Sequence, residues 1–280
     1  MPVHRRGRSA VPEFRLLGRP VSHSVSPALH EAAFRHWGID ASYGALDVAP
    51  EDLESTVARV AAAGGGNVTL PYKSRVAALI ERPGDTVRGT DACNCFWGSP
   101  DGLRGENTDV GGFIAACGDL GVSLAGARVL VLGAGGAARA VLHALEREGA
   151  GRVEIWNRTR SRAEALAAGA RLDTRVRADP PRGIGVDLVV NATRLGLDPA
   201  DPLPLELADV DAGAALDLVY GPDRTAWVRH ASARGIPCAD GVDMLVHQAA
   251  LSLGWWFPER EPPVDAMRRA AAVALGRAPE

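Results

Sequence analysis

A glycine-rich segment at residues 133–136, reading Gly-Ala-Gly-Gly, has the residue types that bind a pyrophosphate. An apolar, β-branched run at 128–132 precedes it and apolar residues at helical spacing follow it, which predicts a buried strand, a tight turn and a helix. Gly133 permits the turn, Gly135 lets the backbone approach the phosphates, and Ala138 lets the helix pack on the strand. N–H groups at the helix start would hold the anion. A glycine turn in another kind of α/β sheet is the alternative.

The segment after the next expected strand, at 152–156, indicates which dinucleotide would bind. Residues 157–162 read Asn-Arg-Thr-Arg-Ser-Arg, where an NAD site would place an acidic residue on the ribose 2′-hydroxyl. Guanidinium groups bind phosphate through paired, charge-assisted hydrogen bonds, so three arginines here favour NADP. The alternative is a solvated basic loop in an arginine-rich chain.

The only lysine of the chain, Lys73, is a candidate for proton transfer. Of the 31 lysine and arginine residues, the other 30 are arginines. An ammonium group can release its proton when its pKa is lowered, whereas a guanidinium does not. Chance retention of one surface lysine is the alternative.

The elements that must position such groups begin with an expected strand at 14–18, which leads to Ser24 and Ser26. Pro27 favours a helix that Ser26 caps and that reaches about residue 37. Capping leaves Ser24 unexplained, so the hydroxyl and N–H groups of this turn are candidates for binding a carboxylate.

Asn67, Thr69 and Lys73 lie together at another expected strand end, and open α/β sheets bind ligands at strand ends. Asp109 begins a helix that runs to about residue 120. A cap is the alternative role for Asp109, but it leaves the preceding Asn and Thr unexplained.

The remaining pattern alternates strands with helices, and residues 171–185 are interpreted as connecting structure. Further strands are expected at 42–47, 93–97, 103–106, 186–190 and 214–219, and further helices at 50–63, 74–80, 225–234, 242–255 and 264–275. This order predicts an α/β protein.

Composition limits the function classes. With 280 residues, 46% apolar content and a net charge of −3, the chain can bury one large or two modest cores and carries no nucleic-acid footprint. It has no run of apolar residues that could span a membrane, and its basic N-terminus, expected to be a frayed tail, lacks the apolar region of a secretory signal. The four cysteines make neither a disulfide framework nor a metal site, which favours a reducing cytoplasm.

Seven motifs, in order and over nearly the whole chain, resemble the shikimate dehydrogenase family, which includes quinate-using relatives. They are GRPVSHSVSP (18–27), GNVTLPYK (66–73), ENTD (106–109), GAGGAARA (133–140), NRTRSR (157–162), VNAT (190–193) and DGVDMLVHQAA (240–250). The serine motif and NVTxPxK are specific to that family and are not general features of dinucleotide folds.

The resemblance implies a two-domain α/β fold. Residues 1–108, completed by 240–280, would form a substrate-binding α/β domain, and 109–239 a Rossmann-type, doubly wound NADP-binding domain. The reaction would be reversible NADPH-dependent reduction of 3-dehydroshikimate to shikimate, a step of aromatic amino acid and chorismate biosynthesis. The partner would be this small molecule, and the protein would be a monomer or homodimer.

The resemblance also implies roles for single residues. Lys73 and Asp109 would form the catalytic pair. Residues on the substrate carboxylate, hydroxyls and carbonyl would be Ser24, Ser26, Tyr220, Asn67, Thr69, Asn94, Asp109 and Gln248. Residues on the cofactor would be Gly133, Gly135, Gly136 and Ala137 at the pyrophosphate, Asn157, Arg158, Thr159 and Arg162 at the ribose phosphate, Thr193, and Gly241 near the nicotinamide.

Five positions depart from the usual family pattern, namely Glu31, Cys95, Arg194, Asp243 and His247. Arg194 and Asp243 are expected near the nicotinamide, where they could pair with each other or change the substrate preference. Quinate or an amino-shikimate analogue is therefore a competing substrate. The chain could also be a non-catalytic NADP-binding regulatory protein, or a Schiff-base lyase that uses the lysine.

Overall fold

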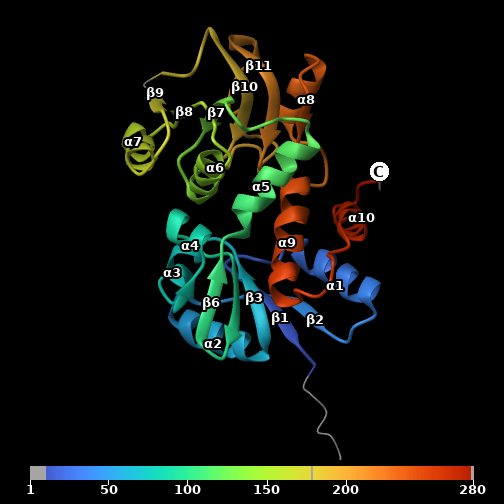
Figure 1. The fold of residues 1–280 in the computed structure, drawn as a ribbon. Helices are drawn as coiled ribbons and strands as arrows, with labels where there is room; N and C mark the ends of the chain where they lie inside the picture. Colours follow the sequence, from blue (N-terminus) through green and yellow to red (C-terminus); the bar gives the residue numbers. More distant parts are fainter. Residues whose placement is uncertain (1–10, 178, 279–280) are drawn as a thin grey trace, which may run out of the picture.

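Two sheets organise the computed structural model, which describes residues 11–177 and 179–278 (Figure 1). The first is built from the N-terminal part of the chain and the second from the middle. The tail expected at the N-terminus falls mostly in residues 1–10, outside the described residues. The two sheets confirm the predicted two-part α/β fold.

The first sheet has the strand order β2-β1-β3-β5-β6-β4. Its strands are β1 (Glu13–Gly18), β2 (Ser42–Asp47), β3 (Gly64–Val68), β4 (Arg82–Pro83), β5 (Cys95–Ser99) and β6 (Gly102–Glu106). Strand β5 is antiparallel to β3 and β6, and the other pairs are parallel. Its helices are α1 (Ser26–Trp37), α2 (Leu53–Ala63), α3 (Lys73–Ala77) and α4 (Asp85–Thr90), with a 3₁₀ turn at Pro50–Asp52.

The second sheet is entirely parallel in the described residues, in the order β12-β11-β10-β7-β8-β9. Its strands are β7 (Arg128–Leu132), β8 (Arg152–Trp156), β9 (Thr174–Arg177), β10 (Ile184–Asn191), β11 (Val210–Asp217) and β12 (Cys238–Ala239). Its helices are α6 (Gly136–Arg147), α7 (Arg160–Ala168) and α8 (Ala226–Ala233), and a 3₁₀ turn lies at Leu207–Asp209. This is the Rossmann order, and the topological switch point lies between β7 and β10.

The prediction of connecting structure at 171–185 is wrong, because strand β9 and the start of β10 lie there. Strand β9 is an edge strand of four residues, Thr-Arg-Val-Arg, with a single apolar side chain. An edge strand needs little apolar content because one side has no neighbour. Its sequence therefore resembles a basic loop.

Alternate side chains of β7 enter the cores on opposite faces of the second sheet. Val129 and Val131 belong to one buried cluster, and Leu130 and Leu132 belong to another. All four are at most 1% exposed. The strand is buried on both faces, as its apolar run predicts.

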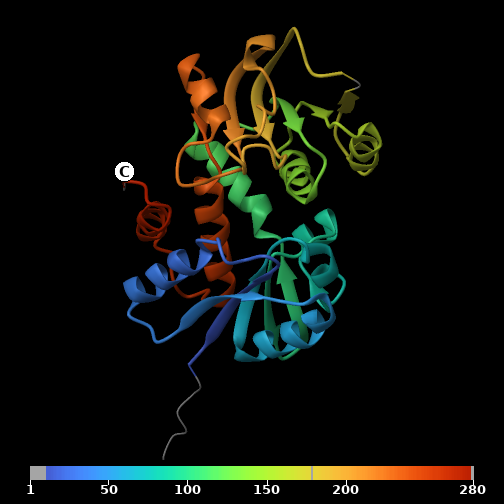
Figure 2. The ribbon, with the colours of Figure 1, turned by 180° about the vertical axis from the view of Figure 1, so that it is seen from behind.

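Two helices, α5 (Thr108–Asp119) and α9 (Val242–Trp256), run side by side between the two sheets (Figures 1 and 2). They approach closely at Gly112, where a Cβ atom would lie 2.9 Å from the carbonyl oxygen of Met244. The last helix, α10 (Val264–Ala274), packs against α1. The C-terminal part of the chain thus returns to the first sheet.

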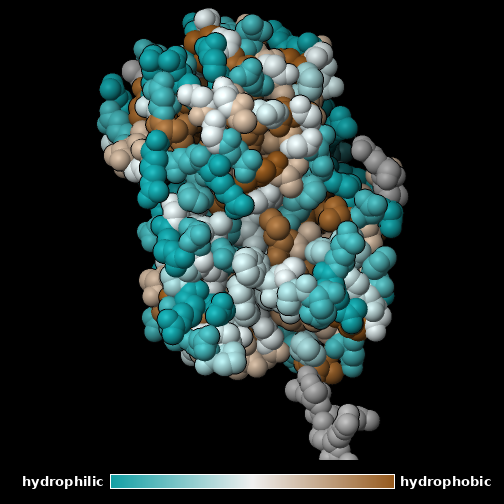
Figure 3. All heavy atoms as spheres, viewed as in Figure 1, coloured by the Kyte–Doolittle hydropathy of each residue, from teal (hydrophilic) through white to brown (hydrophobic). Residues whose placement is uncertain are grey.

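The face shown in Figure 3 is mostly hydrophilic, with scattered hydrophobic side chains. One of the exposed apolar residues is Trp255, which is 46% exposed and stacks on Trp97. Across residues 11–177 and 179–278, no helix combines the length and apolarity needed to cross a membrane. The same residues contain no group of three or more His, Cys, Asp or Glu side chains that could hold a metal ion.

Candidate active site

Lys73 and Asp109 form an ion pair between helices α3 and α5. The Lys73 Nζ atom lies 2.5 Å from Oδ2 of Asp109, and the side chains are 24% and 12% exposed. Lys73 begins helix α3, and Asp109 lies in the first turn of α5. Asn107 caps α5 by accepting a hydrogen bond from the Asp109 N–H, so the alternative role of Asp109 as the cap is wrong.

Asn94 orients the carboxylate of Asp109. Its Nδ2 donates to Oδ1 of Asp109 over 2.7 Å, while its Oδ1 accepts from the backbone N–H of Thr108 over 2.7 Å. Asn94 is 2% exposed. Both carboxylate oxygens are thus bonded, one to an ammonium and one to a fixed amide. Such a network holds the ion pair in one geometry.

Asn67 is held from three sides. Its Nδ2 donates to the carbonyl of Asn94 over 3.0 Å and to Oγ of Ser252 over 2.9 Å, and its Oδ1 accepts from the hydroxyl of Tyr43 over 2.9 Å. Asn67 is only 4% exposed. Tyr43 and Ser252 were not found by sequence reasoning, because neither belongs to a motif that marks a ligand site. The only signal is the position of Ser252, one turn after Gln248 on α9.

Gln248 and Thr69 lie at the edges of this network. Oε1 of Gln248 is 3.4 Å from Nδ2 of Asn94, so α9 contributes a side chain to the same cluster. The backbone N–H of Thr69 donates to the carbonyl oxygen of Leu17 over 2.8 Å, which fixes the segment after β3 against β1. The structure therefore brings Asn67, Asn94, Asp109 and Gln248 into one connected set.

The serine turn before α1 differs from the prediction in one detail. Ser26 is the first helical residue, Val25 occupies the cap position, and no side chain of the cap residue bonds the helix. Instead Oγ of Ser24 accepts from the N–H of Ser26 over 3.2 Å. The turn is thus closed by Ser24, so the prediction that Ser26 caps the helix is wrong. Tyr220 packs against the apolar cluster to which Val25 of this turn also belongs.

The glycine loop has the geometry that its sequence predicts. Gly133 has a φ of +108°, and a Cβ atom there would lie 2.8 Å from the carbonyl oxygen of Ala192. Cβ atoms at Gly135 or Gly136 would meet nothing within 4 Å, and α6 begins without a side-chain cap. Its first N–H groups, including that of Ala137, are available to an anion.

The loop between β8 and α7 presents two exposed arginines. Arg158 and Arg162 are exposed, and the guanidinium group of neither has a hydrogen bond or ion pair within the described residues. Arg160 instead pairs with a glutamate one turn later, at 2.7 Å. The Asn157 side chain closes the loop by donating to the carbonyl of Thr159 over 2.7 Å. The free guanidinium groups match a ribose phosphate in charge and hydrogen-bonding geometry.

The loops at the ends of β10 and β11 are tied together by a buried carboxylate. Thr193 bonds Oδ1 of Asn191 through its N–H and its hydroxyl, and Nδ2 of Asn191 donates to Asp217 over 2.8 Å. Burial raises the pKa of Asp217 to about 6, although hydrogen bonds from Thr225, Val219 and Asn191 oppose that rise. A Cβ atom at Gly241 would lie 2.4 Å from the carbonyl oxygen of Leu218, so only glycine fits beside this loop.

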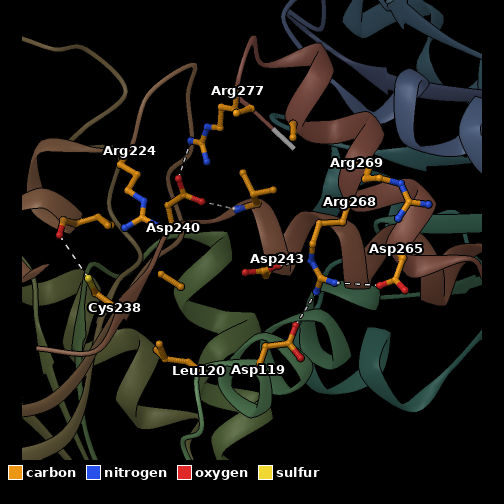
Figure 4. Close-up of a pocket in the computed structure, with 15 residues that line it drawn as sticks. Asp119, Leu120, Arg224, Cys238, Asp240, Asp243, Asp265, Arg268, Arg269 and Arg277 are labelled. Atoms are coloured by element: carbon orange, nitrogen blue, oxygen red, sulfur yellow. Dashed lines mark hydrogen bonds and ion pairs between the residues drawn. The ribbon is translucent and has the colours of Figure 1, made fainter. Parts of the chain in front are cut away.

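The expected pairing of Arg194 with Asp243 does not occur. Oδ1 of Asp243 accepts from Arg268 on α10 over 2.9 Å (Figure 4), whereas Arg194 is exposed without an ion pair in the described part of the chain. His247, one turn further along α9, bonds Oδ2 of Asp119 at the end of α5 over 2.7 Å. These two departures on α9 therefore join helices, because α10 and α5 flank α9.

The remaining departures lie in the first part of the chain. Oε1 of Glu31 accepts from the backbone N–H of Tyr43 over 2.8 Å, which ties α1 to β2. Cys95 is completely buried in β5. Neither the hydrogen bond of Glu31 nor the burial of Cys95 involves the ion pair of Lys73.

Three family models match the chain. Residues 16–96 match the shikimate dehydrogenase substrate binding domain, 116–180 match the shikimate/quinate 5-dehydrogenase model, and 241–272 match the shikimate 5-dehydrogenase C-terminal domain. Among curated proteins, the shikimate dehydrogenase (NADP(+)) of Symbiobacterium thermophilum is 43% identical over 279 residues, covering 93% of each chain. The chain belongs to the shikimate dehydrogenase family.

Solved structures of the shikimate dehydrogenase family have the same fold. Shikimate 5-dehydrogenase from Thermus thermophilus, in complex with NADP(H) and shikimate, superposes with a TM-score of 0.87 at 39% identity, covering 95% of this chain and 100% of that one. The 5-ketofructose reductase of a Gluconobacter species superposes with a TM-score of 0.86 at 30% identity, covering 94% and 98%. The scaffold thus also occurs in a protein named for another substrate.

Proposed function

We propose that this protein is an NADP-dependent shikimate dehydrogenase, which reversibly reduces 3-dehydroshikimate to shikimate. The observation that carries the proposal is the ion pair of Lys73 with Asp109, which Asn94 holds by a hydrogen bond to the carboxylate. It supplies a proton donor and an orienting carboxylate in a family whose relatives bear this name.

The proton step follows from the geometry of the pair. Reduction of a ketone places negative charge on its oxygen, which must be met by a donor within hydrogen-bond reach. Lys73 donates a hydrogen bond to that oxygen and passes it a proton, while Asp109 keeps the ammonium aimed. In the reverse direction the same amine accepts the proton of the substrate hydroxyl.

The remaining polar residues bind the substrate. Ser24, Ser26 and Tyr220 would hold its carboxylate, because the serine turn and Tyr220 adjoin one apolar cluster. Asn94 and Gln248 would bind hydroxyls from the bonded network, with Asn67 and Thr69 beside them.

The nucleotide site fits NADP(H), which when bound supplies or accepts the hydride. The uncapped start of α6 and the open space at its glycines leave room for a pyrophosphate. The guanidinium groups of Arg158 and Arg162, which have no partner among the described residues, suit a 2′-phosphate. We assign cofactor contacts to Gly133, Gly135, Gly136, Ala137, Asn157, Arg158, Thr159, Arg162, Thr193 and Gly241.

The proposal extends to domain limits and location. The substrate-binding domain would end near residue 108 and resume near 240, with the NADP-binding domain between them. The four cysteines are free thiols, as a reducing cytoplasm requires. The protein would act there as a monomer or homodimer.

A different substrate is the second candidate, favoured by the ketofructose reductase that shares the scaffold. Purified protein would be given 3-dehydroshikimate and NADPH while the reduced-nicotinamide absorbance is followed, with NADH and quinate in parallel. Rapid turnover with NADPH supports the proposal. NADPH binding without turnover of 3-dehydroshikimate contradicts it and directs the search to other hydroxylated ketones or to a regulatory role.

The Lys73→Arg variant tests the proton step. It keeps the positive charge beside Asp109 but removes a group that can release a proton, so kcat should fall about 10²- to 10⁴-fold with a small change in substrate KM. The matched control is Arg75→Lys, the reverse exchange two residues along α3, where the exposed side chain donates to the Pro50 carbonyl and lies over the Tyr72 ring. Near-normal kcat in Lys73→Arg would remove Lys73 from proton transfer. Borohydride trapping with substrate would reveal a Schiff base instead.

A further inference from the structure

Arg277, near the C-terminal end of the described residues, has a fixed backbone. Helix α10 is followed by Gly276, whose φ is +72°, and the N–H of Arg277 then donates to the carbonyl of Ala272 over 2.8 Å. This left-handed glycine followed by a bond back into the last turn is a common way of ending a helix. It directs the chain away from α10 and towards the second sheet.

The guanidinium of Arg277 joins two separate segments, and Figure 4 shows its contact with one of them, at Asp240. Nε and Nη2 donate to the carbonyl of Gly221 over 3.0 and 2.6 Å, and Nη2 also reaches the carbonyl of Asp223 over 3.1 Å. Nη2 further lies 2.6 Å from Oδ2 of Asp240, whose side chain is only 8% exposed. One planar group thus bridges a loop and a buried carboxylate, as a guanidinium fork can do.

Both segments carry residues of the proposed site. Tyr220 immediately precedes Gly221, whose carbonyl accepts from Arg277. Gly241 immediately follows Asp240, and its N–H donates to the carbonyl of Val219 over 3.1 Å. The other oxygen of Asp240 accepts from the N–H of Val242, at the start of α9.

Two other arginines labelled in Figure 4, Arg268 and Arg269, have different surroundings. The cavity there, about 590 Å³, is also lined by Arg268 and Arg269. Arg268 pairs with Asp119 and Asp243, which join helices α5, α9 and α10. Arg269 is exposed and, within the described residues, its side chain has no hydrogen bond or ion pair. Arg269 is therefore a matched control in the same cavity.

We propose that Arg277 is a positioning residue for the reaction, holding the Tyr220 loop and the start of α9 where substrate and nicotinamide meet. The inference rests on the proposed function. Without this guanidinium, the loop carbonyls lose their donor and the buried Asp240 loses its 2.6 Å ion pair, which favours movement of both segments. The hydrogen bonds of Arg277 do not reach the adenosine end of the nucleotide site, at the β8–α7 loop.

The test compares Arg277→Gln with Arg269→Gln. We expect Arg277→Gln to raise the KM for shikimate roughly tenfold and to lower kcat severalfold. Its affinity for adenosine 2′,5′-bisphosphate, which probes only the adenosine end, should stay within about twofold of wild type. Arg269→Gln should leave all three unchanged. Added guanidinium ions should lower the raised KM of Arg277→Gln alone.

Unchanged KM and kcat in Arg277→Gln would overturn the proposal. So would equal losses of affinity for shikimate and the bisphosphate, because these indicate general destabilisation. Should Arg277→Gln not fold, Arg277→Lys retains the charge but reaches fewer acceptors, and an unchanged KM there would also overturn the proposal.

Hydrogen exchange separates this inference from the proposed function, because it needs no substrate. Arg277→Gln should exchange faster at 219–223 and 240–243 but not at 157–162. If wild-type protein does not oxidise shikimate, the proposed function fails. If the exchange pattern is absent, the positioning role of Arg277 fails.

Discussion

At the scale of single residues, the polar side chains of the proposed site hold one another before any ligand arrives. Asn67 and Asn94 are each less than 5% exposed, and their amide groups are bonded on both the nitrogen and the oxygen. A buried polar group without a partner is costly, so these bonds fix the amide orientations. The ammonium of Lys73 is therefore presented by a rigid surround.

Asp217 gives a pH dependence of stability. Its pKa rises on folding from 3.8 to about 6, so the folded state binds more protons between these values. Its contribution is present at low pH and is lost as the pH rises through about 6. Asp217→Asn should therefore gain about 2–3 kcal/mol in unfolding free energy, relative to wild type, between roughly pH 4 and pH 7.

Urea unfolding at both pH values measures that change. Asp211→Asn, on the same strand but exposed, is the control and should show no such gain. If the difference in unfolding free energy between Asp217→Asn and wild type is the same at both pH values, the assignment of the pH dependence to Asp217 is contradicted.

At the scale of elements, the site depends on how closely two helices approach. Helix α5 presents Asp109 and helix α9 presents Gln248, and Gly112 lets their backbones meet. A Cβ atom at Gly112 would lie 2.9 Å from Cβ of Gln248. Spacing between these helices therefore sets the position of a substrate-binding side chain.

Gly112→Ala tests that spacing. It should lower the unfolding free energy by about 1–3 kcal/mol, because backbone atoms must move, and it should raise the substrate KM. Gly118→Ala, on an exposed turn of the same helix with nothing within 4 Å, should instead stabilise by about 0.5–1 kcal/mol. Thermal unfolding and steady-state kinetics measure both effects. Equal behaviour of the two variants would refute the close-approach argument.

The loop between β8 and α7 provides a second element-scale prediction. Arg158→Ala and Arg162→Ala should each raise the KM for NADP⁺ about 10- to 100-fold, by removing a charge-assisted bond to phosphate. The KM for NAD⁺, which lacks that phosphate, should change little. Arg160→Ala is the control, because Arg160 is occupied by its ion pair. If all three variants change the KM for NADP⁺ equally, the assignment of Arg158 and Arg162 to the phosphate is contradicted.

At the scale of the whole molecule, the two sheets share helices. Met244 of α9 belongs to the core of the second sheet, whereas Leu253 of the same helix belongs to the core that includes Phe14 of β1. Neither sheet can unfold alone without exposing one side of α9. A change that stabilises one sheet should therefore also stabilise the other.

A ligand of the second sheet should then protect the first. Adenosine 2′,5′-bisphosphate at 100 times its Kd should add about 2.7 kcal/mol of stability. Hydrogen exchange of β1 and β7, followed by mass spectrometry, should slow together in the slowest-exchanging amides. Adenosine 5′-monophosphate at the same concentration is the control. Slower exchange in β7 alone would show that the sheets unfold independently.

The sequence by itself determined the features that depend on neighbouring residues. The apolar run at 128–132, the glycines at 133–136 and the helix after them were predicted together, because backbone freedom and side-chain periodicity are local properties. The arginine loop at 157–162 was also predicted from a local property, its position directly after strand β8. Resemblance across seven motifs then implied the family and the pairing of Lys73 with Asp109.

The tertiary structure alone decided which distant side chains meet. Ser252 bonds Asn67 from 185 residues away, and Arg268, not Arg194, pairs with Asp243. Such contacts depend on the angle and spacing at which helices pack, and these follow from the sum of many weak contacts across the core. No local pattern encodes that sum, so the support around the catalytic pair, including Arg277, became visible only in three dimensions.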